Sequence, residues 1–99
     1  MEKRVPHCPL SVIKALIAAD KVRATASAFQ GARGLGILDL AGMCAVVTAL
    51  TPADFTKSMT THADHRIWQD VYRPRTSAGD VYLKLTVIND VLIVSFKEL

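Results

Sequence analysis

The sequence predicts an α+β fold, with N-terminal helices packed on one face of a C-terminal antiparallel β-sheet. In the first half of the chain, apolar residues recur at the spacing of one helix face, and in the second half they alternate with polar residues. Two β-branched runs near the C-terminus, residues 81–88 and 91–96, are separated by only two residues. Helices followed by strands in this way are typical of a two-layer α+β domain.

The length and composition indicate one compact domain that spans residues 1–99. Hydrophobic residues make up 51% of the chain and charged residues 21%, which is typical of a folded domain rather than a disordered one. A net charge of +3 points mildly to a polyanionic partner, although many small basic proteins bind none. Neither a signal peptide nor an apolar run of membrane-spanning length is visible, so we expect a cytoplasmic protein without a membrane partner.

Three helices are expected in the first half of the chain. The first follows Pro9, ends near Asp20 and shows an apolar stripe at helical spacing, namely Leu10, Ile13, Leu16 and Ile17. The second has Thr25 as its N-cap and is stopped by Gly34 or Gly36. A third helix completes the layer that we expect to cover the sheet.

The third helix is predicted to begin after Asp39. Its apolar stripe consists of Leu40, Met43, Cys44, Val47 and Leu50. Cys44 lies on this stripe and Cys8 has no spacing partner, so both are expected to be reduced cysteines. A capped turn at residues 51–54, with Pro52 at its first position, separates the helices from the strands.

The two C-terminal runs are predicted to form a hairpin around Asn89 and Asp90, which tolerate the positive φ of a two-residue loop. The expected pairs are Ile88 with Val91, Leu85 with Val94, Leu83 with Phe96, Lys84 with Ser95 and Tyr82 with Lys97. The expected core face consists of Leu83, Leu85, Val87, Leu92, Val94 and Phe96. The opposite face then carries a phenol beside an ammonium group, with Cβ atoms about 5 Å apart.

Two more strands, residues 55–61 and 67–75, are expected before the hairpin, with a loop around residues 76–79. If Trp68 and Tyr72 point to the core, the polar face of the hairpin is extended by Gln69, Val71 and Arg73. A slip of one residue reverses this assignment because side chains alternate with period two, and periodicity alone does not choose between the two registers. We prefer the register that places both aromatic residues in the core.

His62 and His65 are the first candidates for metal ligands. They lie three residues apart in the connection between those strands, with Asp64 between them. A protein metal site usually has three or four ligands at recognisable spacing, and Cys8 and Cys44 do not supply them. We therefore expect neither a metal nor a cofactor.

The cationic sheet face meets the requirements of RNA cleavage without a metal. Attack by the 2′-hydroxyl needs a base, positive charge for the phosphorane and an acid for the leaving 5′-oxygen. Lysine, tyrosine and arginine can supply these groups where a crowded positive site lowers a lysine or tyrosine pKa. A simpler interpretation makes the lysines solvated strand residues and Tyr82 a packing partner. On the residues alone, this simpler interpretation is preferred.

Several segments resemble the MqsR family of mRNA interferase toxins. The clearest are MEKR at residues 1–4, KSMTT at 57–61, IWQDVYRPR at 67–75, VYLK at 81–84 and DVLIVSFKE at 90–98. The tract from Lys57 to Arg75 is too long and too particular to be a chance motif, and the resemblance covers essentially the whole chain. The first helix, which is more alanine-rich, and Leu40-Ala41 depart from the family pattern.

The resemblance implies a RelE-like ribonuclease fold and a type II toxin, a metal-independent endoribonuclease that cleaves mRNA at GCU-type sites and inhibits translation and growth. It also implies a cognate antitoxin that bears zinc and binds DNA through a helix-turn-helix. The residues that match the principal catalytic positions of the family are Lys57, Gln69 and Tyr82. The residues that match its supporting positions are Met59, Arg73 and Lys97. Lys84 is added as an RNA-binding candidate from the hairpin register.

Within this site, Lys57 and Lys97 are expected to stabilise phosphate charge, and Tyr82 to assist proton transfer. Arg73 would bind a phosphate and Gln69 would orient the RNA. Which group is the base and which the acid stays open. Two other functions also fit the sequence: an RNA-binding module that does not cleave, and an interaction domain whose sheet edge pairs with a partner strand.

Overall fold

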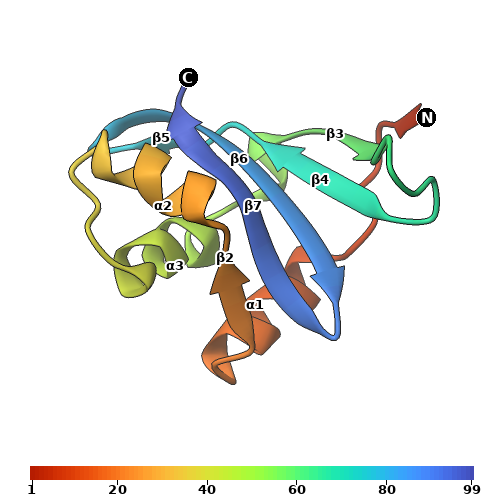
Figure 1. Ribbon diagram of the computed structural model, residues 1–99, viewed down its shortest axis with the longest axis horizontal. Coiled ribbons are helices and arrows are strands. Elements are labelled where there is room, and N and C mark those ends of the chain that lie inside the picture. Colours follow the sequence, from red (N-terminus) through yellow and green to blue (C-terminus); the bar gives the residue numbers. More distant parts are fainter.

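Three helices pack against one face of a β-sheet in the computed structural model, which describes residues 1–99 (Figure 1). The helices are α1 (Leu10–Ala18), α2 (Ala26–Arg33) and α3 (Leu40–Thr48), followed by a short 3-10 turn, η1 (Pro52–Asp54). The strands are β1 (Glu2–Lys3), β2 (Val22–Ala24), β3 (Phe55–Thr60), β4 (Trp68–Tyr72), β5 (Arg75–Thr76), β6 (Gly79–Ile88) and β7 (Asp90–Glu98). None of these helices is long and apolar enough to cross a membrane.

The sheet has the strand order β1-β3-β4-β6-β7-β2, and β5 pairs with β6. All pairings are antiparallel except that of β2 with β7. The predicted α+β fold is confirmed, but the sheet is mixed, and its two outer strands come from the half of the chain that was expected to be helical. Strands of two and three residues are too short for an alternating pattern to reveal them.

The core lies between the helices and one face of the sheet. Its 13 buried residues are Ile13, Ala28, Ala32, Met43, Val47, Leu50, Tyr72, Val81, Leu83, Leu85, Val91, Ile93 and Phe96. At Gly31 the helix α2 approaches β7 so closely that a Cβ atom would lie 2.0 Å from the backbone oxygen of Phe96. The helices therefore lie directly on the apolar face of the sheet, and its other face is left for polar side chains.

The predicted helix caps are confirmed. The side chain of Thr25 accepts a hydrogen bond of 3.0 Å from the backbone N–H of Ala28, and Asp39 accepts one of 2.8 Å from Gly42. The carboxylate of Asp54 accepts one of 2.8 Å from the N–H of Thr51 at the start of η1. These bonds satisfy backbone donors that a helix start otherwise leaves without partners.

The predicted two-residue turn of the hairpin is wrong. Ile88 lies opposite Asp90, so Asn89 stands alone at the tip, with φ of +67°. Leu85 consequently faces Ile93 rather than Val94. The core residues at this end of β7 are Val91 and Ile93, in place of the predicted Leu92 and Val94, which are half-buried.

A β-bulge at Val94 restores the predicted register farther from the turn. Beyond it Lys84 pairs with Ser95, Leu83 with Phe96 and Tyr82 with Lys97, as expected. The unpaired carbonyl of Val94 accepts a hydrogen bond of 2.8 Å from the hydroxyl of Thr25, just after β2. The backbone N–H of Thr25 also donates to the carbonyl of Ile93, at 3.0 Å. The bulge is therefore held by the segment that connects β2 to α2.

A second bulge, at Thr56 in β3, separates Phe55 from Lys57. Phe55 pairs with Tyr72 and meets its ring edge-on, with centroids 5.5 Å apart, whereas Lys57 pairs with Val71. Residues two apart in a regular strand share a face, so without the bulge Phe55 and Lys57 would point the same way. The bulge sends the ring to the core and the lysine to the opposite face.

The register of β4 is the one that we preferred from the aromatic residues. Tyr72 lies opposite Leu83 and is buried in the core, and Val71 lies opposite Lys84. Trp68 points to the same side as Tyr72, but its predicted place in the core is wrong. It is half-buried at the end of the strand, where it stacks on His7 with ring centroids 5.5 Å apart. Gln69 and Arg73 are thereby directed to the face that carries Lys84.

Replacing Thr25 tests how strongly the fold depends on the bulge at Val94. Thr25→Val keeps the shape of the side chain but removes both the cap of α2 and the bond to the Val94 carbonyl. We expect it to lower the free energy of unfolding by about 1–3 kcal/mol, measured by chemical denaturation. Thr25→Ser retains the hydroxyl and should lose much less. A larger loss in Thr25→Ser than in Thr25→Val would show that the methyl group, not the hydroxyl, matters.

Candidate active site

The sheet face that points away from the helices carries a row of residues across four strands. Lys57 on β3 lies opposite Val71 on β4, and Val71 lies opposite Lys84 on β6. Ser95 on β7 continues the row beside Lys84. Val71 is buried although it lies outside the core cluster, and it stands between the two lysines in the strand pairing. The row thus holds one ammonium group on each side of a single apolar residue.

Tyr82 stands in the next row, between two lysines. It pairs with Lys97, whose Nζ lies 5.3 Å from the centroid of the phenol ring, and the Nζ of Lys84 lies 5.9 Å from the same centroid. The carbonyl of Pro74 accepts a hydrogen bond of 3.0 Å from Val81. This bond extends the β4–β6 register and places Arg73 opposite Tyr82. Lys97, the predicted neighbour of the phenol, is therefore beside it, and Arg73 flanks Tyr82 on the other side.

Met59 and Gln69 form the third row, since they pair directly between β3 and β4. Glu2 on β1 lies opposite Met59. All of the predicted site residues are thus brought to one face: Lys57, Met59, Gln69, Arg73, Tyr82, Lys84 and Lys97. The sequence argument placed Tyr82, Lys84 and Lys97 there from the hairpin, and Gln69 and Arg73 from the preferred register of the preceding strand. The strand pairings now add Lys57 and Met59.

Burial and charge repulsion both act on the lysines of this face. Partial burial, followed by the charges of Lys97 and Lys57, lowers the pKa of Lys84. Lys57 is the exception, because its Nζ donates a hydrogen bond of 2.9 Å to a carboxylate oxygen of Glu2. A group of repelling cations on a solvated surface is an arrangement that a bound anion would stabilise.

The sequence argument missed two carboxylates that shape this region, Glu2 on the same face and Asp70 behind it. Asp70 is only 3% exposed and accepts hydrogen bonds from the backbone N–H groups of His7 and Cys8, each at 3.0 Å, and from the hydroxyl of Ser58 at 2.6 Å. These bonds fasten the N-terminal segment to the back of the sheet. An aspartate at a core-facing strand position was the available signal for Asp70, whereas no sequence pattern revealed Glu2.

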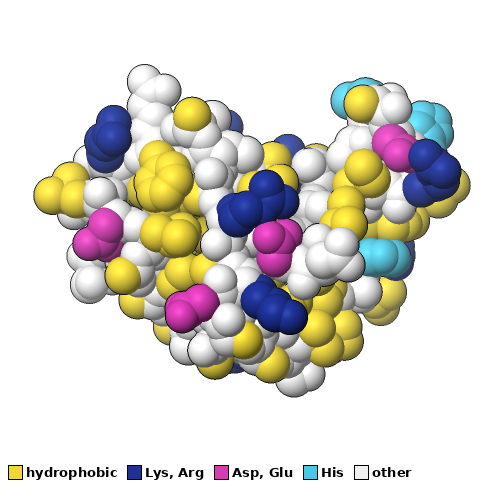
Figure 2. Space-filling model, turned by 60° about the horizontal axis from the view of Figure 1, so that its bottom comes forward, with side chains coloured by type: hydrophobic (Ala, Val, Ile, Leu, Met, Phe, Trp, Pro, Cys, Tyr) yellow, Lys and Arg dark blue, Asp and Glu magenta, His cyan; other side chains and the backbone are white.

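The candidate metal ligands do not assemble into a site. His62 and His65 lie in the exposed loop between β3 and β4, where Asp64 is paired with Arg66 at 3.0 Å. Figure 2 shows the histidines at the end of the molecule that carries this loop and the N-terminal segment. No group of three or more His, Cys, Asp or Glu side chains could hold a metal ion, and Cys8 and Cys44 are free and half-buried.

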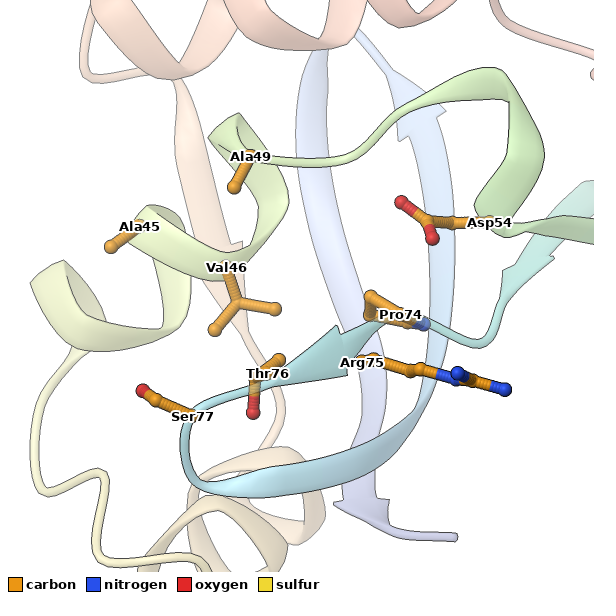
Figure 3. A pocket seen from close by; sticks show the side chains of 8 residues that line it. All are labelled: Ala45, Val46, Ala49, Asp54, Pro74, Arg75, Thr76 and Ser77. Carbon is orange, nitrogen blue, oxygen red and sulfur yellow. The ribbon is translucent and has the colours of Figure 1, made fainter.

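A hollow of about 310 Å³ lies away from the cationic face, between α3 and the segment that leads into β5 (Figure 3). Ala45, Val46 and Ala49 line it from the helix, with Pro74, Arg75, Thr76, Ser77 and Asp54 on the other side. None of the predicted site residues lines this hollow. The chemistry suggested by the sequence therefore belongs to an open surface rather than to a cavity.

The cationic face has the groups that phosphodiester chemistry requires. Tyr82 offers a hydroxyl for proton transfer, and the ammonium groups of Lys84 and Lys97 lie beside it. Arg73 extends the positive charge along the row of Tyr82, and Lys57 extends it along the row of Lys84, where the charge could stabilise a phosphorane. An extended, open and positively charged face suits a single-stranded polyanion better than a small ligand.

Comparison with known proteins identifies the family of this chain. Residues 5–98 match the family described as "Motility quorum-sensing regulator, toxin of MqsA". The chain is also similar to the mRNA interferase toxin MqsR of Escherichia coli (strain K12), with 62% identity over 98 residues that cover 99% of each protein. The match spans nearly the whole chain and so includes every strand of the cationic face. The chain therefore belongs to the MqsR toxin family.

Proposed function

We propose that this protein is an mRNA interferase, an endoribonuclease that cleaves mRNA without a metal ion and acts as the toxin of a type II toxin–antitoxin system. The observation that carries the proposal is the position of Tyr82 between the ammonium groups of Lys84 and Lys97 on an open sheet face. The relative named as an mRNA interferase toxin supports it, because it is 62% identical over the same residues.

In the proposed reaction, the 2′-oxygen attacks the adjacent phosphorus and the bond to the 5′-oxygen breaks. The products are a 2′,3′-cyclic phosphate and a 5′-hydroxyl. Lys57 and Lys97 stabilise the charge of the phosphorane, and Tyr82 takes part in proton transfer. Lys84 is available as a second proton-transfer group, since its pKa is lowered by burial and by its cationic neighbours.

The remaining residues would hold the RNA. Arg73, opposite Tyr82, binds a neighbouring phosphate, and Gln69 and Met59 contact the nucleotide beside the cleaved bond. Cleavage at GCU-type sites, inhibition of translation and growth, and action in the cytoplasm are further parts of the proposal that come from the family resemblance. The proposed partner is a cognate antitoxin that bears zinc and a helix-turn-helix.

Cleavage is expected to continue in excess EDTA, because the chain has no group of donors that could hold a metal ion. The test is gel analysis of an RNA oligonucleotide that the chain cleaves, with chemical mapping of the new ends. The 5′ fragment should end in a 2′,3′-cyclic phosphate or a 3′-phosphate. Reversible loss of activity on chelation, or a 3′-hydroxyl end, would contradict the mechanism. A chain that binds RNA without cleaving it would support the RNA-binding alternative.

Tyr82→Phe and Lys97→Ala are expected to act as one unit. Each should lower kcat by about 100-fold or more, and the double variant should lose little more than the worse single variant. The melting temperature should hardly change, because neither substitution removes a core contact. If Tyr82→Phe instead melts much earlier and cleaves normally per folded molecule, the phenol has a packing role and the proposed site is wrong.

Lys84→Met should stabilise the protein at neutral pH while weakening its binding to RNA. A folded-state pKa below the unfolded value means that protonated Lys84 destabilises the fold at low and neutral pH, and this effect disappears as the pH rises through both values. Methionine keeps the stem and removes the charge, so we expect a gain of up to about 1 kcal/mol in the free energy of unfolding. The part of this stability gain that comes from charge repulsion should shrink at high salt. Lys21→Met, which removes a charge at an exposed position, is the control. A loss of stability would show that Lys84 makes favourable contacts that outweigh the repulsion.

A further inference from the structure

The ammonium group of Lys57 is held by a carboxylate from the other end of the chain. A carboxylate oxygen of Glu2 lies 2.9 Å from the Nζ of Lys57, and the side chains are 52% and 30% exposed respectively. The hydrogen bond from Lys57 and then its positive charge lower the pKa of Glu2. Glu2 is therefore ionised at neutral pH and forms a charge-assisted hydrogen bond with a principal residue of the proposed site.

The backbone around Glu2 is fixed on both sides. The carbonyl of Met1 accepts a hydrogen bond of 3.0 Å from the N–H of Thr60, and Glu2 lies opposite Met59 in the β1–β3 ladder. On the other side, the Arg4 guanidinium donates to the carbonyl of Thr56 at 3.4 Å. Alternation along β1 then directs Glu2 to the cationic face. The contact with Lys57 thus belongs to the paired sheet and not to a loose terminus.

Glu2 distinguishes Lys57 from the other cations of the site. The ion pairs of the molecule are Lys57 with Glu2, Arg23 with Asp90 and Arg66 with Asp64. Arg73, Lys84 and Lys97 consequently have no carboxylate partner. An ammonium group has three N–H donors, so Lys57 can keep its bond to Glu2 and still offer two donors to a phosphate.

We infer that Glu2 is a positioning residue of this face, whose carboxylate holds the Lys57 ammonium group where an RNA phosphate meets it; this inference rests on the proposed function. A lysine side chain is long and flexible, so fixing its end before the substrate binds favours the reaction. The same carboxylate repels the phosphates of the RNA. Glu2 therefore improves turnover and weakens binding, and the two effects are separable because one needs a hydrogen-bond acceptor and the other a negative charge.

The test compares Glu2→Ala and Glu2→Gln. Glu2→Ala removes acceptor and charge, so kcat should fall roughly tenfold, while an RNA with 2′-deoxyribose at the cleaved nucleotide should bind about two- to fivefold more tightly. Glu2→Gln keeps an acceptor oxygen, so it should bind RNA as tightly as Glu2→Ala but recover kcat to within about threefold of the unmodified protein. Glu98→Ala removes one charge from an exposed residue of β7 and is the control for net charge.

Lys57→Ala separates this inference from the proposed function. If Lys57→Ala cleaves RNA normally, the proposed site itself is wrong. If it loses cleavage while Glu2→Ala keeps full kcat, the site stands and only the role of Glu2 is overturned. A Glu2→Gln variant as slow as Glu2→Ala would also overturn it, because the carboxylate would then act by its charge or as a base. In single-turnover assays, Glu2→Ala should lower the rate no further when Lys57 is already alanine.

Discussion

Two β-bulges allow one thin sheet to support a core on one face and a cationic site on the other. In β3, Thr56 separates Phe55 in the core from Lys57 on the site, and in β7 the bulge at Val94 separates buried Ile93 from Ser95. Each bulge leaves a carbonyl outside the ladder, and each carbonyl accepts a hydrogen bond from a side chain at or beside an outer strand: Arg4 for Thr56 and Thr25 for Val94. The short outer strands thus stabilise the irregularities on which both faces depend.

The two faces make opposite contributions to stability. The helices cover an apolar face whose burial supplies most of the free energy of folding. On the other face, partial burial and then the charges of Lys97 and Lys57 lower the pKa of Lys84. A bound polyanion would stabilise such a group of cations. Among the cations of the proposed site, only Lys57 has a carboxylate partner, which is Glu2.

The hairpin shows how a prediction can be right at the site and wrong at the turn. A two-residue loop implied that Tyr82 faces Lys97, and it does, but Ile88 faces Asp90 instead of Val91. The tighter turn shifts the pairing by one residue, and the bulge at Val94 shifts it back before Ser95. Alternation therefore assigned Leu92 and Val94 wrongly to the core, because a regular strand was assumed across the irregular position.

Local chemistry was enough to predict the helix caps at Thr25 and Asp39, the apolar stripes and the change from helical to strand periodicity. These follow from neighbouring residues, whose spacing sets which side chains share a face. The side of β4 that carries Gln69 and Arg73 did not follow from spacing and was chosen by a preference for aromatic residues in the core. The outer strands, the bulges and the contact of Glu2 with Lys57 could not be predicted in this way. They depend on contacts between residues far apart in the chain. Glu2 and Lys57 are 55 positions apart, and Thr25 and Val94 are 69 positions apart. Such pairings arise only when the packed helices and sheet bring distant segments together.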